Sequence, residues 1–171
     1  MKMRITCRDL YCIILCIFIP AIGQANEKRI IGWVENVKVM SADFEFSAKL
    51  DTGALTSSIN AIDIEEFEKE DETWVRFKII NNDNESRVIE LPQERIVKIK
   101  RHVGKSQKRH VVKMGLCLGN VYKETQVSLV NREKFVYKLL IGRRFLKDDF
   151  VIDPSEHHIT TPDCEKEESD Q

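Results

Sequence analysis

The sequence has few of the residues that build metal centres and disulfide frameworks. Its 171 residues include four histidines and five cysteines. No His-Glu-x-x-His pair occurs, which excludes the commonest zinc-peptidase signature. Three of the cysteines fall within the first 25 residues, so only Cys117 and Cys164 remain beyond them. Two cysteines can pair in an oxidising compartment, but they do not make a framework, and the sequence leaves their state open.

A long hydrophobic run is also missing. The apolar stretch Leu10–Ile22 has 13 residues and is interrupted by Pro20, whereas a membrane-spanning helix needs about 20. A basic start precedes it and Gly23-Gln24-Ala25 follows it, which together predict a signal peptide over residues 1–25, cleaved after Ala25. We therefore expect a secreted protein, in the periplasm. The alternative is an uncleaved segment that anchors the chain to a membrane.

The chain beyond residue 25 has no excess of positive charge. Removing Lys2, Arg4 and Arg8 from 27 Lys and Arg leaves 24, and removing Asp9 from 28 Asp and Glu leaves 27, so the remainder carries a net charge of −3. This balance argues against a nucleic-acid partner.

Strand-like alternation runs through most of the chain. Phe44, Phe46, Ala48 and Leu50 alternate with polar residues, the period expected of a half-buried strand. Residues 60–69 have strand spacing too, although their glutamates would also suit a helix. We predict one all-β domain over residues 26–160, mostly antiparallel, followed by a disordered acidic tail over residues 161–171. Further strands are expected over 29–40, with a kink at Gly32-Trp33, and over 74–79, 87–91, 96–103, 110–118, 122–130, 135–141 and 150–154, with one short helix over 143–148.

A polar, glycine-bearing stretch separates two of these strands. Gly104–Lys108 lies between residues 96–103 and 110–118, whose arms are rich in β-branched residues. This pattern predicts a projecting hairpin with Gly104 near its tip.

The most distinctive loop follows the strand that ends at Asp51. Thr52, Gly53 and Ala54 come next, and Gly53 permits a sharp turn and a close approach to a ligand. The serines and threonines that follow can hydrogen-bond the carboxylate and the loop backbone. Taken alone, this pattern is also compatible with a strand followed by a polar turn.

A second motif lies about ninety residues later, where the apolar run Leu139-Leu140-Ile141 ends in Gly142-Arg143. The pair of motifs resembles the retropepsin-like aspartic proteases, whose subunit carries Asp-Thr/Ser-Gly-Ala on one loop and an apolar-apolar-Gly-Arg segment before a short helix. With Trp74–Phe77 included, it resembles more closely a bacterial subfamily commonly labelled ATP-dependent zinc protease. The resemblance covers roughly residues 29–155 and implies a retropepsin-like closed β-barrel, a single acid-protease lobe.

The resemblance assigns roles on the first loop. Asp51 matches the catalytic aspartate, Thr52 the residue whose hydroxyl braces the paired loops, and Gly53 the glycine beside the substrate, with Ala54 completing the motif. Retroviral members usually carry an acidic residue two places after this glycine. Leu55 stands there in this chain, so we expect its subunit interface to differ from that of the retroviral enzymes.

The resemblance assigns roles on the second motif as well. Ile141, Gly142 and Arg143 match its apolar-Gly-Arg core, with the glycine packed under the catalytic loop. Because its usual acidic partner is absent, Arg143 must find another. Gly104 is a looser match to the tip of the flap.

The chain offers only one Asp-Thr-Gly, whereas this chemistry needs two carboxylates that share a proton. We therefore expect a homodimer with Asp51 from each copy at the two-fold axis. The predicted function is a secreted aspartic endopeptidase, acting on a peptide or protein substrate without a cofactor. Asp153 lies in a similar apolar setting, but Asp-Pro-Ser lacks the glycine and indicates a turn.

Three other functions are alternatives to this one. His102 and His110 could face each other across the predicted hairpin and bind a metal with a carboxylate, although we expect no metal site. Gly104-Lys105-Ser106 resembles the end of a phosphate loop, but Ile99 stands where that loop needs a glycine, so ATP binding is not expected. The third alternative is a secreted β-barrel that binds a partner without catalysis.

Overall fold

The structure is a computed structural model that describes residues 27–99 and 107–164. The predicted signal peptide, the expected flap tip Gly104 and most of the predicted acidic tail lie outside these ranges. Among the described residues, no helix is long and apolar enough to cross a membrane.

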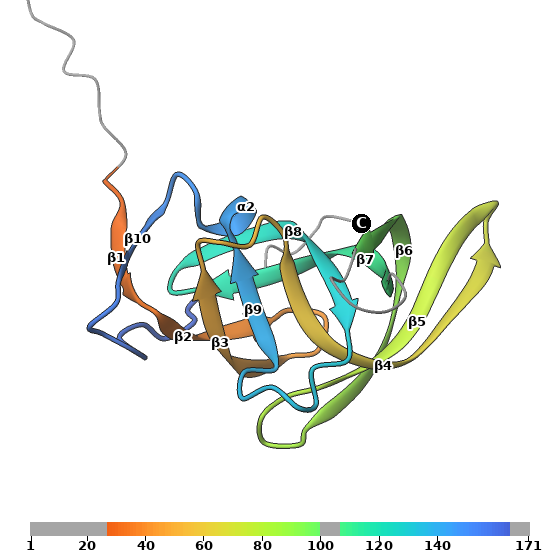
Figure 1. Ribbon diagram of the computed structural model, residues 1–171, viewed down its shortest axis with the longest axis horizontal. Coiled ribbons are helices and arrows are strands. Elements are labelled where there is room, and N and C mark those ends of the chain that lie inside the picture. Colours follow the sequence, from red (N-terminus) through yellow and green to blue (C-terminus); the bar gives the residue numbers. More distant parts are fainter. Residues whose placement is uncertain (1–26, 100–106, 165–171) are drawn as a thin grey trace, which may run out of the picture.

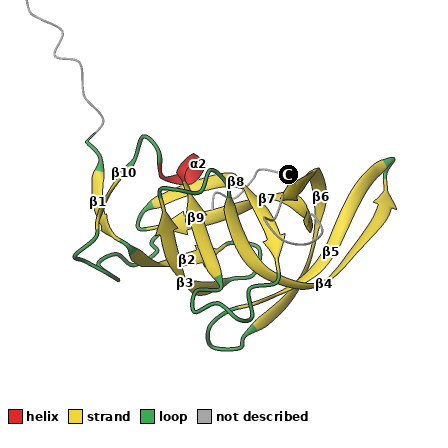
Figure 2. Ribbon diagram, viewed as in Figure 1, coloured by secondary structure: helices red, strands yellow, loops and turns green. Residues whose placement is uncertain are grey.

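Strands dominate the described chain, and the one helix that the structure describes is a single turn (Figures 1 and 2). The elements are β1 (Arg29–Gly32), β2 (Val34–Val39), β3 (Phe44–Asp51), β4 (Ser57–Lys69), β5 (Glu72–Ile80), β6 (Ser86–Ile99), β7 (Gln107–Leu118), β8 (Val121–Val130), β9 (Leu139–Gly142), α2 (Arg143–Leu146) and β10 (Phe150–Asp153). The predicted all-β class with one short C-terminal helix is confirmed.

The strands close into a ring. The large sheet has the order β2-β3-β9-β4-β5-β6-β7-β8, and two additional pairings join β2 to β7 and β4 to β8. A closed path therefore runs through β2, β3, β9, β4, β8 and β7. Within it, β3–β9 and β4–β8 are parallel pairs and the other pairs are antiparallel. This closed barrel is the architecture that the resemblance implied.

Large apolar side chains from alternate strand positions fill the barrel. Phe46 of β3 and Phe77 of β5 are completely buried, as is Phe145 of α2, and Ala48 and Leu50 of β3 are buried as well. The period-two pattern of β3 therefore sends one set of side chains inward, and burying each large side chain stabilises the fold by roughly 1.5–3 kcal/mol.

Two predicted strands are in fact a single element. Residues 87–91 and 96–103 were expected to be separate, but β6 runs without a break through Pro92 to Ile99. It pairs with β5 up to Pro92 and with β7 from Gln93 onward. Proline lacks an N–H, and it is tolerated here because the strand changes partner at that residue.

The predicted strand over 135–141 is wrong in its first half, because β9 begins only at Leu139. Phe135 and Val136 are 56% and 76% exposed, so their apolar side chains do not contribute to the core. The loop instead folds around Lys138, whose Nζ donates hydrogen bonds to the carbonyl oxygens of Glu133 and Phe135. The predicted helix is also shorter, ending at Leu146.

Residues 29–40 divide into β1 and β2 at Trp33, within the expected kink at Gly32-Trp33, and β1 pairs in parallel with β10. The chain beyond β10 is tied to the rest of the fold by hydrogen bonds and by a disulfide. Glu35 is completely buried, and its carboxylate accepts hydrogen bonds from the backbone N–H and the hydroxyl of Thr160. Cys117 and Cys164 form a disulfide with their Cα atoms 6.0 Å apart. This settles the state that the sequence left open.

Two hairpins extend from the barrel. The β4–β5 hairpin projects at one end of the molecule (Figure 1), and its turn residues Glu70 and Asp71 have φ values of 54° and 60°, as in a two-residue type I′ turn. The arms of the predicted flap hairpin pair as expected, with Ile96 opposite His110 and Ile99 opposite Gln107.

Candidate active site

Asp51 is the last residue of β3, at the point where the strand enters the loop over residues 52–56. Its Oδ1 accepts hydrogen bonds from the N–H groups of Gly53 (2.8 Å) and Ala54 (3.2 Å). The residue is partly exposed. The loop therefore fixes one carboxylate oxygen by its own backbone and leaves the group accessible to solvent.

Gly142 lies beside Asp51, opposite it in the parallel β3–β9 register. A Cβ at this position would be 2.7 Å from the carbonyl carbon of Thr56 and 3.0 Å from the nitrogen of Ser57. The Gly142 N–H donates to Ser57 Oγ at 3.1 Å in a buried hydrogen bond. Only glycine lets the loop pack this closely, which is the arrangement that the resemblance implied. The neighbouring Ile141 is buried in the core.

Arg143 braces the loop from outside. Its Nη1 donates to the carbonyl oxygens of Thr52 (2.6 Å) and Gly53 (2.9 Å), and its backbone N–H donates to the Ala54 carbonyl (2.8 Å). Leu55, which stands where retroviral members have an acidic residue, is 52% exposed. Backbone carbonyls thus take the place of the missing acidic partner.

A cavity of about 360 Å³ opens beside this loop. Three arginines line it, Arg95 from β6, Arg109 from β7 and Arg132 from the loop after β8, and the described lining residues include no Asp or Glu. Arg95 donates to Gln126 Oε1 and Arg109 to Gln107 Oε1. The cavity is therefore strongly basic although the whole chain carries a net charge of −1.

Arg132 is the most buried of these arginines, at 9% exposed. Its guanidinium donates to Ser58 Oγ and to the Tyr137 carbonyl, both at 3.1 Å. Burial lowers its pKa first, the nearby charge of Arg109 lowers it further, and the negative charge of Asp51 opposes both. A nearby anion stabilises the charge of a guanidinium in this setting, because burial has removed part of its hydration.

The sequence prediction missed this basic cavity. Arg95, Arg109 and Arg132 are far apart in the chain, and the residues around each of them have the composition of an ordinary strand or loop. Arg132 is placed by Asn60, whose Oδ1 accepts its backbone N–H at 2.6 Å across 72 residues of sequence. Sequence spacing gives no signal for a contact of that range.

The metal alternative involved His102 and His110, and His102 lies outside the described residues. His110 Nδ1 is 2.6 Å from Gln93 Oε1, and its Nε2 is 3.7 Å from Glu66 Oε1. In the described part of the chain, no three His, Cys, Asp or Glu side chains are grouped closely enough to hold a metal ion.

Asp153 forms a turn at the end of β10. The hydroxyl and then the backbone N–H of Ser155 donate to its Oδ1, and both hydrogen bonds lower the pKa of its carboxyl group. It belongs to the start of the C-terminal segment and not to the Asp51 loop.

A family profile described as retropepsin-like aspartic endopeptidase RimB matches residues 30–163. The chain belongs to the RimB-like family. The profile match agrees with the resemblance seen in the two motifs, and the matched residues include the whole described barrel.

Curated relatives of this RimB-like chain carry another name. A probable alpha-L-glutamate ligase from Shewanella pealeana is 36% identical over 112 residues, and one from Desulfotalea psychrophila is 32% identical over 111. These matches cover 64% and 63% of this chain but only 24% of each relative. The chain thus spans about a quarter of their length.

A solved structure has the same fold. The crystal structure of a protein of unknown function from Legionella pneumophila is 32% identical and superposes with a TM-score of 0.68, covering 79% of this chain and 100% of that one.

Proposed function

We propose that this RimB-like protein is an aspartic endopeptidase that hydrolyses acidic peptides. The observation that carries the proposal is the position of Asp51. Its loop fixes the carboxylate by two backbone N–H groups, Gly142 packs directly against that loop, and the cavity alongside is basic.

The chemistry needs a second carboxylate, which a second copy of the chain supplies. One Asp51 carboxylate accepts a proton from water as the water oxygen attacks the peptide carbonyl carbon, and the protonated partner carboxyl donates its proton to the carbonyl oxygen. The tetrahedral intermediate then collapses and the C–N bond breaks. The leaving nitrogen takes the proton that the first carboxyl acquired, and the partner carboxylate takes back a proton from one hydroxyl of the intermediate, which leaves a carboxylic acid product. Two carboxylates about 3 Å apart share one proton because both cannot be ionised.

Apolar side chains beside the loop support the dimer. A shallow cavity of about 190 Å³ is lined by Thr52, Arg143, Lys147 and apolar residues of α2 and β10. A two-fold partner placed here would cover exposed apolar groups and bring its own Asp51 loop toward the first.

The basic cavity and the named relatives together support an acidic substrate. Arg132, Arg109 and Arg95 present guanidinium groups that bind carboxylates through charge-assisted hydrogen bonds. The relatives that contain a similar segment are named probable alpha-L-glutamate ligases. We propose that this chain cleaves α-linked glutamyl peptides of the kind such a ligase would form. The chain matches only about a quarter of those relatives, and its own Asp51 loop suits hydrolysis, so we do not propose ligation here.

We also propose that the protein works outside the cytoplasm, through the predicted signal peptide. The Cys117–Cys164 disulfide supports an oxidising compartment. Fractionation of cells that produce the full chain, with the N-terminus of the product sequenced, tests both the location and cleavage after Ala25.

The central experiment compares the parent with Asp51→Asn on two matched peptides, one rich in glutamate and one with lysine at the same positions. We expect the parent to cleave the glutamate peptide and the variant to lose at least about 10³-fold in kcat/KM, since the amide cannot act as a base. Thermal unfolding of both proteins serves as the folding control. Equal turnover by the variant would refute the aspartic mechanism.

Mixing tests the shared site. Excess Asp51→Asn protein added to the parent should suppress activity, because mixed dimers carry a single carboxylate. Activity per parent chain that is unaffected by the variant, and that stays constant on dilution, would place the whole site within one subunit.

A further inference from the structure

The barrel leaves a gap where β8 ends. β8 pairs with β4 over Ser57–Asn60 and stops at Val130, while β4 continues to Lys69 bonded only to β5. On the other side, β7 pairs with β6 from Gln107 and with β8 from Val111. A strand has two edges, so within the described ranges one edge of β4 beyond Asn60 has no strand partner.

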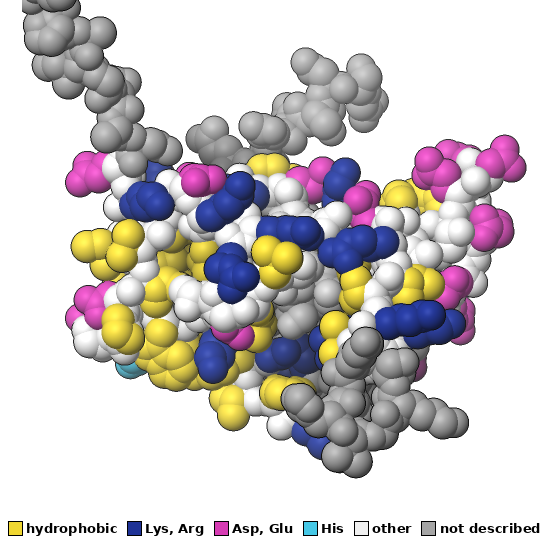
Figure 3. Space-filling model, turned by 45° about the horizontal axis from the view of Figure 1, so that its top comes forward, with side chains coloured by type: hydrophobic (Ala, Val, Ile, Leu, Met, Phe, Trp, Pro, Cys, Tyr) yellow, Lys and Arg dark blue, Asp and Glu magenta, His cyan; other side chains and the backbone are white. Residues whose placement is uncertain are grey.

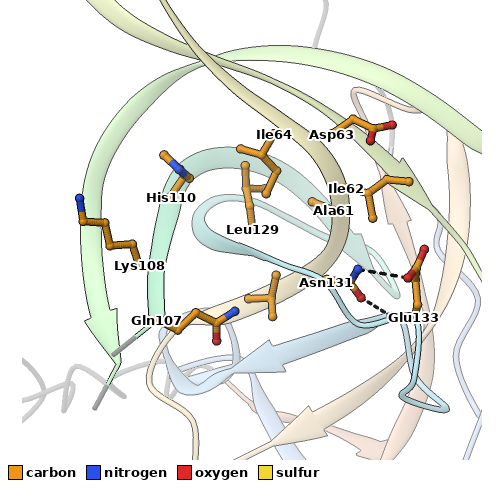
Figure 4. Close-up of a pocket in the computed structure, with 11 residues that line it drawn as sticks. Ala61, Ile62, Asp63, Ile64, Gln107, Lys108, His110, Leu129, Asn131 and Glu133 are labelled. Atoms are coloured by element: carbon orange, nitrogen blue, oxygen red, sulfur yellow. Dashed lines mark hydrogen bonds between the residues drawn. The ribbon is translucent and has the colours of Figure 1, made fainter. Parts of the chain in front are cut away.

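A cavity of about 570 Å³ occupies this gap (Figure 4). Ile62 and Ile64 line it from β4, Lys108 and His110 from β7, and Leu129 from the end of β8. In Figure 4 these side chains surround one opening, with strands on either side of it. The gap thus lies in line with β8 and combines an apolar lining with a backbone edge that can hydrogen-bond, the two features that an added strand uses.

The charge along the open edge of β4 has one dominant sign. Beyond the cavity β4 carries Glu65, Glu66 and Glu68. The turn adds Glu70 and Asp71, and β5 begins with Glu72, whereas Lys69 is the one cation within residues 65–72. Acidic side chains gather at this end of the molecule in the space-filling view (Figure 3). The feature is separate from the basic cavity beside Asp51, whose charge has the opposite sign.

We propose that the open edge of β4 is a docking site for an extended, basic segment of a partner protein, which binds as an added strand in line with β8. Its apolar side chains would contact Ile62, Ile64 and Leu129 in the cavity. Its lysines or arginines, further along, would pair with Glu66 and Glu68. Because antiparallel strands bond to one neighbour at every second residue, the remaining N–H and C=O groups of β4 are available for main-chain bonds to the segment.

One existing contact changes on binding. Glu66 Oε1 lies 3.7 Å from His110 Nε2, so this pair connects β4 to β7 across the gap. A basic side chain of the partner would compete with His110 for Glu66. The same His110 is held by Gln93 through its Nδ1 and keeps that contact.

The proposal rests on the strand edge and not on peptidase activity, so the test uses the full-length Asp51→Asn protein. The probe is a labelled eight-residue peptide of alternating valine and lysine. Two control peptides share its length: one has alternate amides N-methylated, and one has glutamate in place of lysine. Fluorescence polarisation measures binding, and amide hydrogen exchange over residues 61–69 locates it.

We expect the probe to bind and to protect amides of 61–69. N-methylation should weaken binding at least about tenfold, since it blocks main-chain bonding on one edge, and the glutamate peptide should not bind. The double variant Glu66→Lys/Glu68→Lys should also weaken binding at least tenfold. The matched control Glu45→Lys/Glu124→Lys makes the same change in net charge at exposed sites elsewhere and should bind as the parent does.

Other outcomes overturn the proposal. These are absence of binding, equal binding of the N-methylated peptide, equal weakening by the control variant, and protection confined to residues outside 61–69. Edge-to-edge association of the protein with itself, detected by sedimentation and abolished by Glu66→Lys/Glu68→Lys, would assign the edge to a second copy instead. Unfolding of any variant is checked by its thermal midpoint, and the peptide controls on the unchanged protein then decide.

Discussion

The two ends of β4 behave very differently although they belong to one strand. At its beginning, Ser58 and Ile59 pair with β8 on one side and with β9 on the other. At its far end, Glu66 to Lys69 pair with β5 alone and are largely exposed. The register shift between Ile62 and Glu65, where Asp63 has a φ of 51°, separates the two ends.

The difference shows how a small barrel can hold a precise site and an open edge together. The buried end fixes Gly142 through Ser57 and Arg132 through Ser58 and Asn60. These hydrogen bonds hold Gly142 and Arg132 in place, so a substitution at the buried end of β4 should alter the Asp51 loop. The exposed end has few packing partners, so a change there should leave the loop intact.

The largest effect is expected at the buried end, from Gly142→Ala. The added Cβ would meet backbone atoms of residues 55–57 at 2.7–3.0 Å. Because the main chain cannot move aside as a flexible side chain can, we expect a loss of about 3 kcal/mol in the free energy of unfolding. Displacing the loop should cost a further factor of roughly 10² in kcat/KM. Urea denaturation and peptide hydrolysis measure the two effects, and a variant with parental values in both would contradict the close packing.

The next effect concerns Arg132, which joins the buried end of β4 to the basic cavity. We expect Arg132→Gln to lower kcat/KM for the glutamate-rich peptide by roughly 10- to 100-fold, equivalent to the 1.5–3 kcal/mol of a hydrogen bond to a charged group. Most of the loss should be in KM, and a neutral peptide should be affected much less.

The matched control for this experiment is Arg132→Lys, which keeps the charge but not the forked donor geometry. It should recover part of the affinity for the acidic peptide. Equal losses on acidic and neutral peptides for both variants would show that Arg132 only supports the fold.

A smaller effect is expected from Ser57→Ala. It removes the hydroxyl that accepts the Gly142 N–H and leaves that buried donor without its partner. We expect a loss of about 1–2 kcal/mol in the free energy of unfolding. Thr160→Ala removes another hydrogen-bonded hydroxyl, which donates to Glu35 from the C-terminal segment, and should leave hydrolysis closer to the parent. If the two variants affect activity equally, the Ser57 contact has no special role.

The smallest effect is expected at the exposed end. Glu66→Lys/Glu68→Lys should change the free energy of unfolding by about 1 kcal/mol or less, because partly exposed ion pairs contribute little. Hydrolysis of a short glutamate-rich peptide by this variant should stay within about twofold of the parent. A large loss of either property would show that the two ends of β4 are coupled.

Local chemistry determines much of this fold. Alternation identified β3, β5, β7 and β8, and Gly53 and Gly142 marked the two loops that the barrel brings together. The pattern failed at Phe135–Tyr137, where apolar residues at strand spacing form an exposed loop. Alternation indicates which side chains can face a core, but it does not indicate whether a neighbouring strand is available for pairing.

By itself the sequence determined the all-β class and the Asp51 and Gly142 motifs, because each depends on residues that are close in the chain. The two motifs together indicated the family. Tertiary structure alone decided the closure of β4 on β8, the Cys117–Cys164 disulfide and the meeting of three arginines beside Asp51. These depend on contacts between distant segments, such as Asn60 with Arg132. Strand periodicity is the same for every possible partner, so only the packing of the whole barrel selects which strands meet and which edge of β4 stays open.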